Sequence, residues 1–408
     1  MSNISPLDRQ GKLRVLLTNT SIAYRTGSEL FIRDVAVELL KRGHTPIVYS
    51  PRLGELAQEL RVATIPVVDD LNSISVPPDI IHGHHHLETM TALSHFWNVP
   101  AVFFCHGILP WEEMPPIHPR ILRYVAISEA IRDRMIYEFA IPEQSVTMFS
   151  GFVDLQRFKT RPSPLPLVPN RALIFSNYAS EDNYVGSVRE ACRRHGISLD
   201  VVGSGYGTAH PNPENILGNY DLIFARGRAA LESMAVGAAV ICCDVEGAGS
   251  LVTSANLDWF RRNNLGIRSL NRPITVDLLA DEISCYDAND AARVSQKIRA
   301  TAGLSFAVDR ILEIYEDVLT VWDAVENKFG LDGSEDHAVA AYLKWISKTA
   351  RQTGSIETEL NNTKAELENM RSTLTWKFRE RMTSIPLIRN FYFWLFGQDK
   401  NQPRLNKD

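Results

Sequence analysis

The chain has 408 residues, 45% of them hydrophobic, and a formal net charge of −5 at pH 7. This length predicts two or three domains, and the apolar content suffices for sizeable cores. The slightly acidic balance excludes general nucleic-acid binding, because proteins of that class present clustered positive charge. We therefore expect no nucleic-acid partner.

Cysteine usage and the N-terminal residues indicate a cytoplasmic protein. The five cysteines show neither zinc-ligand nor redox spacing, which favours buried, reduced thiols. Residues 1–12 lack the apolar region of a secretory signal, and no apolar run is long enough to span a bilayer. A cytoplasmic protein of this kind could also bind to the inner face of the cell membrane.

The first part of the chain alternates strand-like and helix-like runs. Residues 13–19 are a short β-rich run typical of a buried parallel strand. After the turn RTGSE, the three-to-four spacing of apolar residues predicts a helix over 29–44, with Ser28 as its N-cap. Ser128 is predicted to cap a second helix, 129–139. Further strands are predicted at 45–51, 63–68, 79–84, 100–107 and 124–128.

A Pro-rich segment, residues 160–169, interrupts this alternation and predicts a linker between two domains. Strands are then predicted at 171–177, 198–205, 220–226 and 238–244, with helices between them. An amphipathic helix over 304–329 closes the body. Strands that alternate with helices form parallel sheets, so the fold class is α/β, with two tandem Rossmann-like, doubly wound domains facing a cleft. The predicted parts are 1–160, 161–303, a closing helix at 304–330, and a helical tail at 331–408.

The tail carries two patterns. Apolar residues follow heptad steps over 354–378, which suits either a self-associating coiled coil that makes a homo-oligomer or one amphipathic helix packed on the body. Residues 376–397 join a cationic stretch to an aromatic cluster. This composition suits peripheral contact with an anionic membrane, or packing on a partner or on the body.

The sequence HGHHH at residues 82–86 suggests a metal site, because His82, His84 and His86 would share one face of an extended segment. No further Asp/His pair at ligand spacing is evident elsewhere, so we expect no metal site. For a lone histidine in a cleft, such as His82, a hydrogen-bonding or structural role is the more common one. For His85 we expect a solvated loop residue.

Strand ends predict where these histidines lie. His82 ends one predicted strand and His106 ends the next, while RTGSE follows the first strand. Ligands of open α/β sheets bind outside the carboxyl ends of the strands. The three features should therefore meet at one edge of the first domain.

Several motifs, in this order and spacing, resemble those of the GT-B glycosyltransferases, and among them glycosyltransferase family 4, a retaining, nucleotide-sugar-dependent group. The resemblance covers roughly residues 13–320. The motifs are TGSE (26–29), DIIHGHHH (79–86), VPAVFFCHG (99–107), YVAISEAIRDRM (124–135), GFVDLQRF (151–158), VVGSGYG (201–207) and YDLIFARGRAALESMAVGAAVICCD (220–244).

The resemblance implies a donor site with named residues. His106 would contact the sugar near the anomeric centre, as the catalytic histidine, and Glu232 would accept hydrogen bonds from the ribose hydroxyls. Gly227 opens a helix whose N-terminus, with Arg226 and Arg228, suits a diphosphate. The other residues assigned to donor binding are Gly27, Gly203 and Gly205, and those assigned to the acceptor or sugar side are Glu29, His82 and His84. For Gly203 and Gly205 a plain tight turn explains the pattern equally well.

Two departures from the family pattern stand out. The family's first motif glutamate has no counterpart here: the loop before Glu232 is shortened, and the glutamate's place falls near Phe224 or is deleted. The family's diphosphate-binding Arg and Lys are also missing, because Ser176, Asn177 and Tyr178 stand at that strand end. Cations at a diphosphate make strong hydrogen bonds, so their loss should weaken donor binding unless Arg226 and Arg228 replace them from the other loop.

The expected function is transfer of a sugar from a nucleotide-sugar donor to a glycan or lipid-linked acceptor, with retention, without metal and without another cofactor. Cell-surface polysaccharide synthesis would fit such an acceptor. The alternative is an inactive glycosyltransferase-like scaffold that acts through its helical tail.

Overall fold

The computed structural model describes residues 11–326, 334–347, 349–350 and 363–364. Its contacts divide the chain into two compact units, Met1–Glu335 and Asp336–Asp408. Apart from residues 363–364, the predicted heptads at 354–378 and the basic aromatic stretch at 376–397 lie outside the described residues. In the parts of the chain that are described, no helix has the length and apolarity needed to cross a membrane.

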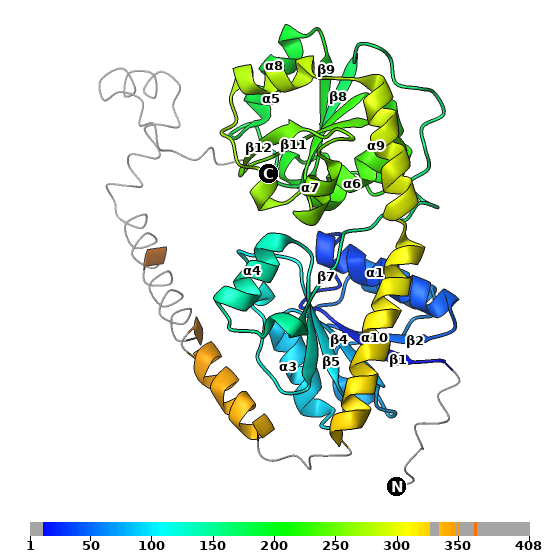
Figure 1. Ribbon diagram of the computed structural model, residues 1–408, viewed down its shortest axis with the longest axis vertical. Helices are drawn as coiled ribbons and strands as arrows, with labels where there is room; N and C mark the ends of the chain where they lie inside the picture. The colour runs from blue at the N-terminus through cyan, green and yellow to red at the C-terminus, as the bar shows by residue number, and fades with distance from the viewer. Residues whose placement is uncertain (1–10, 327–333, 348, 351–362, 365–408) are drawn as a thin grey trace, which may run out of the picture. The chain divides into compact units, whose positions relative to one another are not determined.

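The first sheet of the larger unit has seven parallel strands in the order β3-β2-β1-β4-β5-β6-β7 (Figure 1). Its central strands are almost fully buried, which explains their continuous apolar runs. The strands are β1 (Arg14–Thr18), β2 (Thr45–Tyr49), β3 (Val67–Val68), β4 (Ile80–His84), β5 (Ala101–Cys105), β6 (Ile121–Ala126) and β7 (Val146–Met148). The helices between them are α1 (Gly27–Lys41), α2 (Glu55–Val62), α3 (His86–His95) and α4 (Glu129–Tyr137).

The second sheet has five strands in the order β12-β11-β10-β8-β9, with β12 antiparallel to its neighbour. The strands are β8 (Arg171–Phe175), β9 (Ser198–Val202), β10 (Leu222–Ala225), β11 (Ala239–Asp244) and β12 (Gly247–Leu251). The helices are α5 (Val185–Arg194), α6 (Gly227–Val236), α7 (Leu257–Arg262), α8 (Val276–Ser284) and α9 (Ala288–Thr301). The predicted fold class, two Rossmann-like α/β domains in tandem, is confirmed.

The chain passes between the two sheets twice, and the two crossings are hydrogen-bonded to each other. The Val153 N–H donates to the Ala302 carbonyl at 2.8 Å, and the Leu304 N–H donates to the Val153 carbonyl at 2.9 Å. The second crossing leads into α10 (Leu304–Glu326), which returns to the first sheet and packs on α1, β5 and β6 (Figure 1, yellow). The boundary at residue 160 stays a prediction.

Local details differ from the sequence-based expectations. Helix α1 begins at Gly27 with Thr26 as its N-cap, so the assignment of Ser28 was wrong. The reason is a capping box, in which the Glu29 carboxylate accepts the Thr26 backbone N–H at 3.0 Å. Ser128 does cap α4, accepting the Ile131 N–H. Strands β7 and β12 were missed because one has only three residues and the other, GAGSL, carries little apolar signal.

Helix α10 supplies a direct test of this packing. Ile311 of α10 is fully buried, whereas Phe306 on the same helix is 60% exposed. Ile311→Ala should lower the free energy of unfolding by about 2–5 kcal/mol through lost burial and a residual cavity. Thermal unfolding should show a clearly lower midpoint for Ile311→Ala and little change for Phe306→Ala. Equal effects of the two substitutions would contradict the placement of α10.

Candidate functional site

Three histidines form a stack at the carboxyl end of the first sheet. His82 and His84 lie on one face of β4 because side chains alternate along a strand, and His106 follows β5. The imidazole centroids of His82 and His84 are 4.7 Å apart, and those of His84 and His106 are also 4.7 Å apart, with the rings nearly parallel. His84 Nδ1 and His106 Nε2 share a hydrogen bond of 2.7 Å. The structure therefore brings all three side chains together.

Burial makes this stack electrically neutral. His82 and His84 have no exposed surface, while His106 is partly exposed and is the member that reaches the solvent. Burial lowers the pKa of His106 to about 4, with Glu113 opposing that shift and His85 adding to it. Burial also pushes the pKa values of His82 and His84 well below their ordinary value. At pH 7 each ring thus carries one donor and one acceptor nitrogen.

His85 is part of a polar network, so the expectation of a solvated loop residue was wrong. Its side chain is only 13% exposed and its Nε2 lies 3.6 Å from the Glu113 carboxylate. Burial lowers the pKa of His85 but Glu113 raises it, and the net direction is upward. His85 Nδ1 lies 3.0 Å from the Thr20 hydroxyl, and the Glu113 carboxylate accepts the His106 backbone N–H at 2.7 Å. His85 also has a φ of 59°, a strained conformation of the kind that gathers at functional sites.

Sequence reasoning missed Glu113 and Thr20. Both lie in segments that follow strands, and no sequence motif around either residue indicates its contact with His85. They could have been found only from the rule that all such segments of one parallel sheet meet at the same edge.

The start of α1 lies beside the histidine stack. Gly27 is the first residue of the helix, and the Phe31 ring lies 4.7 Å from the His106 ring, centroid to centroid. Glu29 is only 2% exposed, and its carboxylate accepts the backbone N–H groups of Tyr24 and Thr26. These bonds account for Glu29 as a cap of α1. Its assignment to the sugar side stays a prediction.

The start of α6 places arginines at the carboxyl end of the second sheet. Arg226 is the N-cap, and its guanidinium contacts the Asp244 and Glu246 carboxylates at 2.6 and 3.0 Å. Gly227 follows with a φ of 53°, a left-handed conformation that favours glycine. Arg226, one of the two cations predicted at this helix start, is therefore paired with carboxylates.

Arg228 joins the two sheets. Its guanidinium makes an ion pair with Asp34 of α1 and a second one with Glu232 at 2.7 Å. Glu232 is 5% exposed, and burial raises its pKa although Arg228 works in the opposite direction. Burial tends to raise the pKa of Asp34, but Arg228 and Arg33 outweigh it and the pKa is lowered. The guanidinium of Arg228 thus links α6, at the carboxyl end of the second sheet, to α1 beside the first sheet.

Two predicted donor-site glycines are explained by close backbone packing. A Cβ on Gly203 would lie 1.8 Å from the Ser176 carbonyl oxygen, and one on Gly205 would lie 2.6 Å from the Asn177 carbonyl oxygen. The end of β9 therefore lies tightly against the loop after β8, which is the tight-turn explanation. A role in donor binding stays a prediction.

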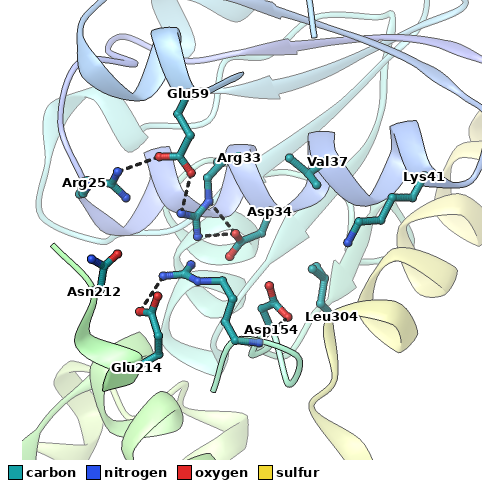
Figure 2. A pocket seen from close by; sticks show the side chains of 11 residues that line it. Arg25, Arg33, Asp34, Val37, Lys41, Glu59, Asp154, Asn212, Glu214 and Leu304 are labelled. Atoms are coloured by element: carbon teal, nitrogen blue, oxygen red, sulfur yellow. Dashed lines mark hydrogen bonds and ion pairs between the residues drawn. The ribbon is translucent and has the colours of Figure 1, made fainter. Parts of the chain in front are cut away.

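A polar cavity of about 330 Å³ adjoins the Arg228 bridge through Asp34. Its wall carries cations and carboxylates in balance, and Figure 2 shows Glu59 between Arg25 and Arg33. From the side of the second sheet, Glu214 enters the wall and is paired with Arg157 at 2.9 Å. Sequence reasoning assigned none of these residues to the site. Among the described residues, no group of three or more His, Cys, Asp or Glu is arranged to hold a metal ion.

Comparisons with known proteins agree with this architecture. Residues 71–157 match the family model described as Glycosyltransferase Family 4. A glycosyltransferase from Rickettsia africae ESF-5 superposes with a TM-score of 0.55 at 17% identity, over 76% of this chain and 99% of that chain. Anabaena HepE, in complex with UDP and glucose, superposes with a TM-score of 0.54 at 15% identity, over 75% of this chain and 100% of that one.

The chain has the GT-B glycosyltransferase fold. A second HepE structure, in complex with UDP, superposes on it with a TM-score of 0.56 at 15% identity, over 74% and 99% of the two chains. The resemblance to family 4 is confirmed for residues 71–157. A comparison with curated protein sequences finds no match.

In this GT-B fold the departures from the family pattern have structural counterparts. Phe224, near the place of the missing glutamate, is fully buried in β10. Ser176, where an arginine is expected, donates a hydrogen bond to Asp244 at 2.8 Å. Because Arg226 contacts that same carboxylate, one guanidinium does lie at this strand end.

Close packing at Gly203 predicts a selective loss of stability. Gly203→Ala forces a methyl group onto the Ser176 carbonyl, so the thermal unfolding midpoint should fall by several degrees or more. Gly186→Ala on α5 is the matched control, since a Cβ there meets nothing within 4 Å. That control should be neutral or slightly stabilising. A Gly203→Ala protein as stable as wild type would show that the strand end is looser than described.

The neutral stack predicts a dependence of stability on pH. His106 stays unprotonated in the folded chain down to about pH 4, whereas an unfolded histidine takes up a proton below about pH 6.5. The unfolded state then binds more protons, so stability should fall as the pH drops through this window. In His106→Gln the loss between pH 7 and pH 5, followed by thermal unfolding, should be smaller than in wild type. His210→Gln, in an exposed loop, should behave like wild type; an equal reduction in both variants would contradict the prediction.

Proposed function

We propose that the protein is a glycosyltransferase that binds a nucleotide-sugar donor between its two sheets. The observation that carries this proposal is the Arg228–Asp34 ion pair, because it sets the start of α6 opposite α1 and the histidine stack. In a GT-B fold the carboxyl ends of both sheets then border one binding region. HepE, a neighbour in fold, was crystallised with UDP-glucose, which supports this class of donor.

The start of α6 suits the diphosphate. A helix N-terminus offers unpaired backbone N–H groups and the positive end of the helix dipole. Arg226 and Arg228 add two guanidinium groups at the same place. We infer that they replace the Arg and Lys that the family pattern would place after β8.

His106 and Glu232 would contact the two ends of the donor. A neutral, partly exposed imidazole such as His106 can donate or accept one hydrogen bond at a sugar hydroxyl without attracting a counter-charge. Glu232 would accept the ribose hydroxyls, which requires that Arg228 yield one of its two carboxylates. The reaction would move the sugar to a glycan or lipid-linked acceptor, with retention and without a metal. Residues 376–397 would bring the enzyme to a membrane surface.

One observation favours the alternative, an inactive scaffold. Arg226 and Arg228 are both already paired with carboxylates, and Glu232 is already occupied by Arg228. Breaking buried pairs costs free energy, because each charge left behind is unpaired until the ligand replaces its partner. Under this alternative the pairs hold the two sheets together and no nucleotide displaces them.

Calorimetric titration separates these functions. The full chain is titrated with UDP, GDP and their common sugar conjugates, first without and then with a divalent metal ion. The proposal predicts saturable binding of one nucleotide class without metal. No binding of any nucleotide under either condition would support the scaffold instead, and binding only with metal would contradict the metal-independent mechanism.

The arginine assignment has its own test. Changing both Arg226 and Arg228 to Ala should weaken nucleotide-diphosphate affinity at least about tenfold, because hydrogen bonds to charged groups contribute about 1.5–3 kcal/mol each. The matched control changes Arg193 and Arg194 on α5 to Ala, which removes the same charge from exposed positions. Unchanged affinity in a first variant that still folds would refute the assignment.

A further inference from the structure

One side chain of helix α10, that of Tyr315, contacts the buried end of the histidine stack at His82. Tyr315 is fully buried, and its hydroxyl shares a hydrogen bond with His82 Nδ1. The two residues are 233 positions apart in the sequence, and α10 reaches this place only after the chain has passed through the second sheet. The contact is thus a tertiary one that ties α10 to β4.

The tyrosine fixes the ring of His82 in orientation and in tautomer. His82 Nε2 is buried without a hydrogen-bond partner, so the Tyr315 hydroxyl is the ring's polar contact in the described structure. If the Tyr315 hydroxyl donates to Nδ1, the His82 Nε2–H is the one group left unpaired. If Nδ1–H donates instead, both the phenol proton and the Nε2 lone pair are left unpaired, which costs more. Tyr315 therefore donates, and the proton of His82 sits on Nε2.

Stacking passes this orientation on to His84. The His82 ring lies between Phe104, at 4.0 Å between centroids, and His84, at 4.7 Å. Interplanar angles of 15° and 14° leave a rotated His82 ring no room without disturbing both neighbours.

A hydrogen bond between His84 and His106 couples the orientations of these two rings. His84 Nε2 is buried without a partner, and Nδ1 is bonded to His106 Nε2 at 2.7 Å. When His84 Nδ1 donates, the unpaired Nε2 is an acceptor, which is tolerated better than an unpaired donor. His106 then carries its proton on Nδ1.

We propose that Tyr315 is a positioning residue for His106, acting through His82 and His84 to set the orientation of the imidazole that reaches the solvent. The inference rests on the proposed function in one respect, that His106 faces the donor sugar. Tyr315 itself would touch no substrate.

The test uses the full chain labelled with ¹⁵N in the histidine rings, in which long-range ¹H–¹⁵N spectra report each tautomer. Tyr315→Phe keeps the aromatic ring and removes the hydroxyl. The matched control is Tyr220→Phe, which removes the hydroxyl of another buried tyrosine, bonded to Asp200 at 2.9 Å in the second sheet. Single His→Gln variants at 82, 84 and 106 assign the three signals.

The proposal predicts that Tyr315→Phe shifts the ring signals of His82, His84 and His106, while Tyr220→Phe leaves them in place. A change confined to His82 would overturn it. His82→Asn is the second variant, because it can still accept the Tyr315 hydroxyl proton but removes the stacked ring. It should shift His106 as well, and an unmoved His106 signal in a folded His82→Asn protein would also overturn the proposal.

Turnover separates the inference from the function on which it rests. With a nucleotide-sugar that the wild type accepts, Tyr315→Phe should lower kcat at least about tenfold through misplacement of His106 and leave nucleotide affinity within about twofold. An unchanged kcat with shifted His106 signals would overturn the positioning role. If the wild type turns over no donor, the proposed function fails, and the spectra still decide whether Tyr315 sets the His106 ring.

Discussion

One largely buried guanidinium links the two sides of the site. Arg228 is 18% exposed and lies between a carboxylate of the first sheet's α1 and a carboxylate of its own helix. A charge with this little access to water is stable only while it is paired, so separating the sheets would leave Arg228 and Asp34 unpaired together. This pairing helps to hold the carboxyl ends of the two sheets opposite each other.

The two sides of the site differ in charge. On the first sheet the stacked histidines are neutral, because burial lowers their pKa values far enough to keep protons away at neutral pH. On the second sheet the start of α6 carries two arginines beside a helix N-terminus. A ligand with an uncharged sugar at one end and a diphosphate at the other matches this difference. The arginines are already paired, however, so binding of such a ligand would have to exchange carboxylates for phosphate oxygens.

Much of this arrangement follows from local sequence. Apolar runs between helical patterns predict both parallel sheets, and Ser128 marks the start of α4. The meeting of His84 with His106 follows from the rule that parallel strands end at one edge. A local pattern also misled at α1, where Ser28 was chosen as the cap although Glu29 closes a capping box with Thr26.

The remaining features depend on contacts between distant residues. Asp34 meets Arg228 across 194 positions and Tyr315 meets His82 across 233, and neither pair carries a signal in its own segment. His85 was expected to be a solvated loop residue, but Glu113, 28 residues later in the chain, lies against it. Such partners are chosen by the packing of the sheets and helices, which a single sequence does not display.

Hydrogen–deuterium exchange of the full chain, with and without saturating UDP- or GDP-sugars, tests the central claim most directly. The account predicts slower exchange on both sides of the site at once, at the start of α6 near residues 226–232 and, on the first sheet, at residues 84–88 and 106–113. Protection of one side alone, or of neither while a nucleotide-sugar is bound elsewhere, would contradict a donor site between the two sheets.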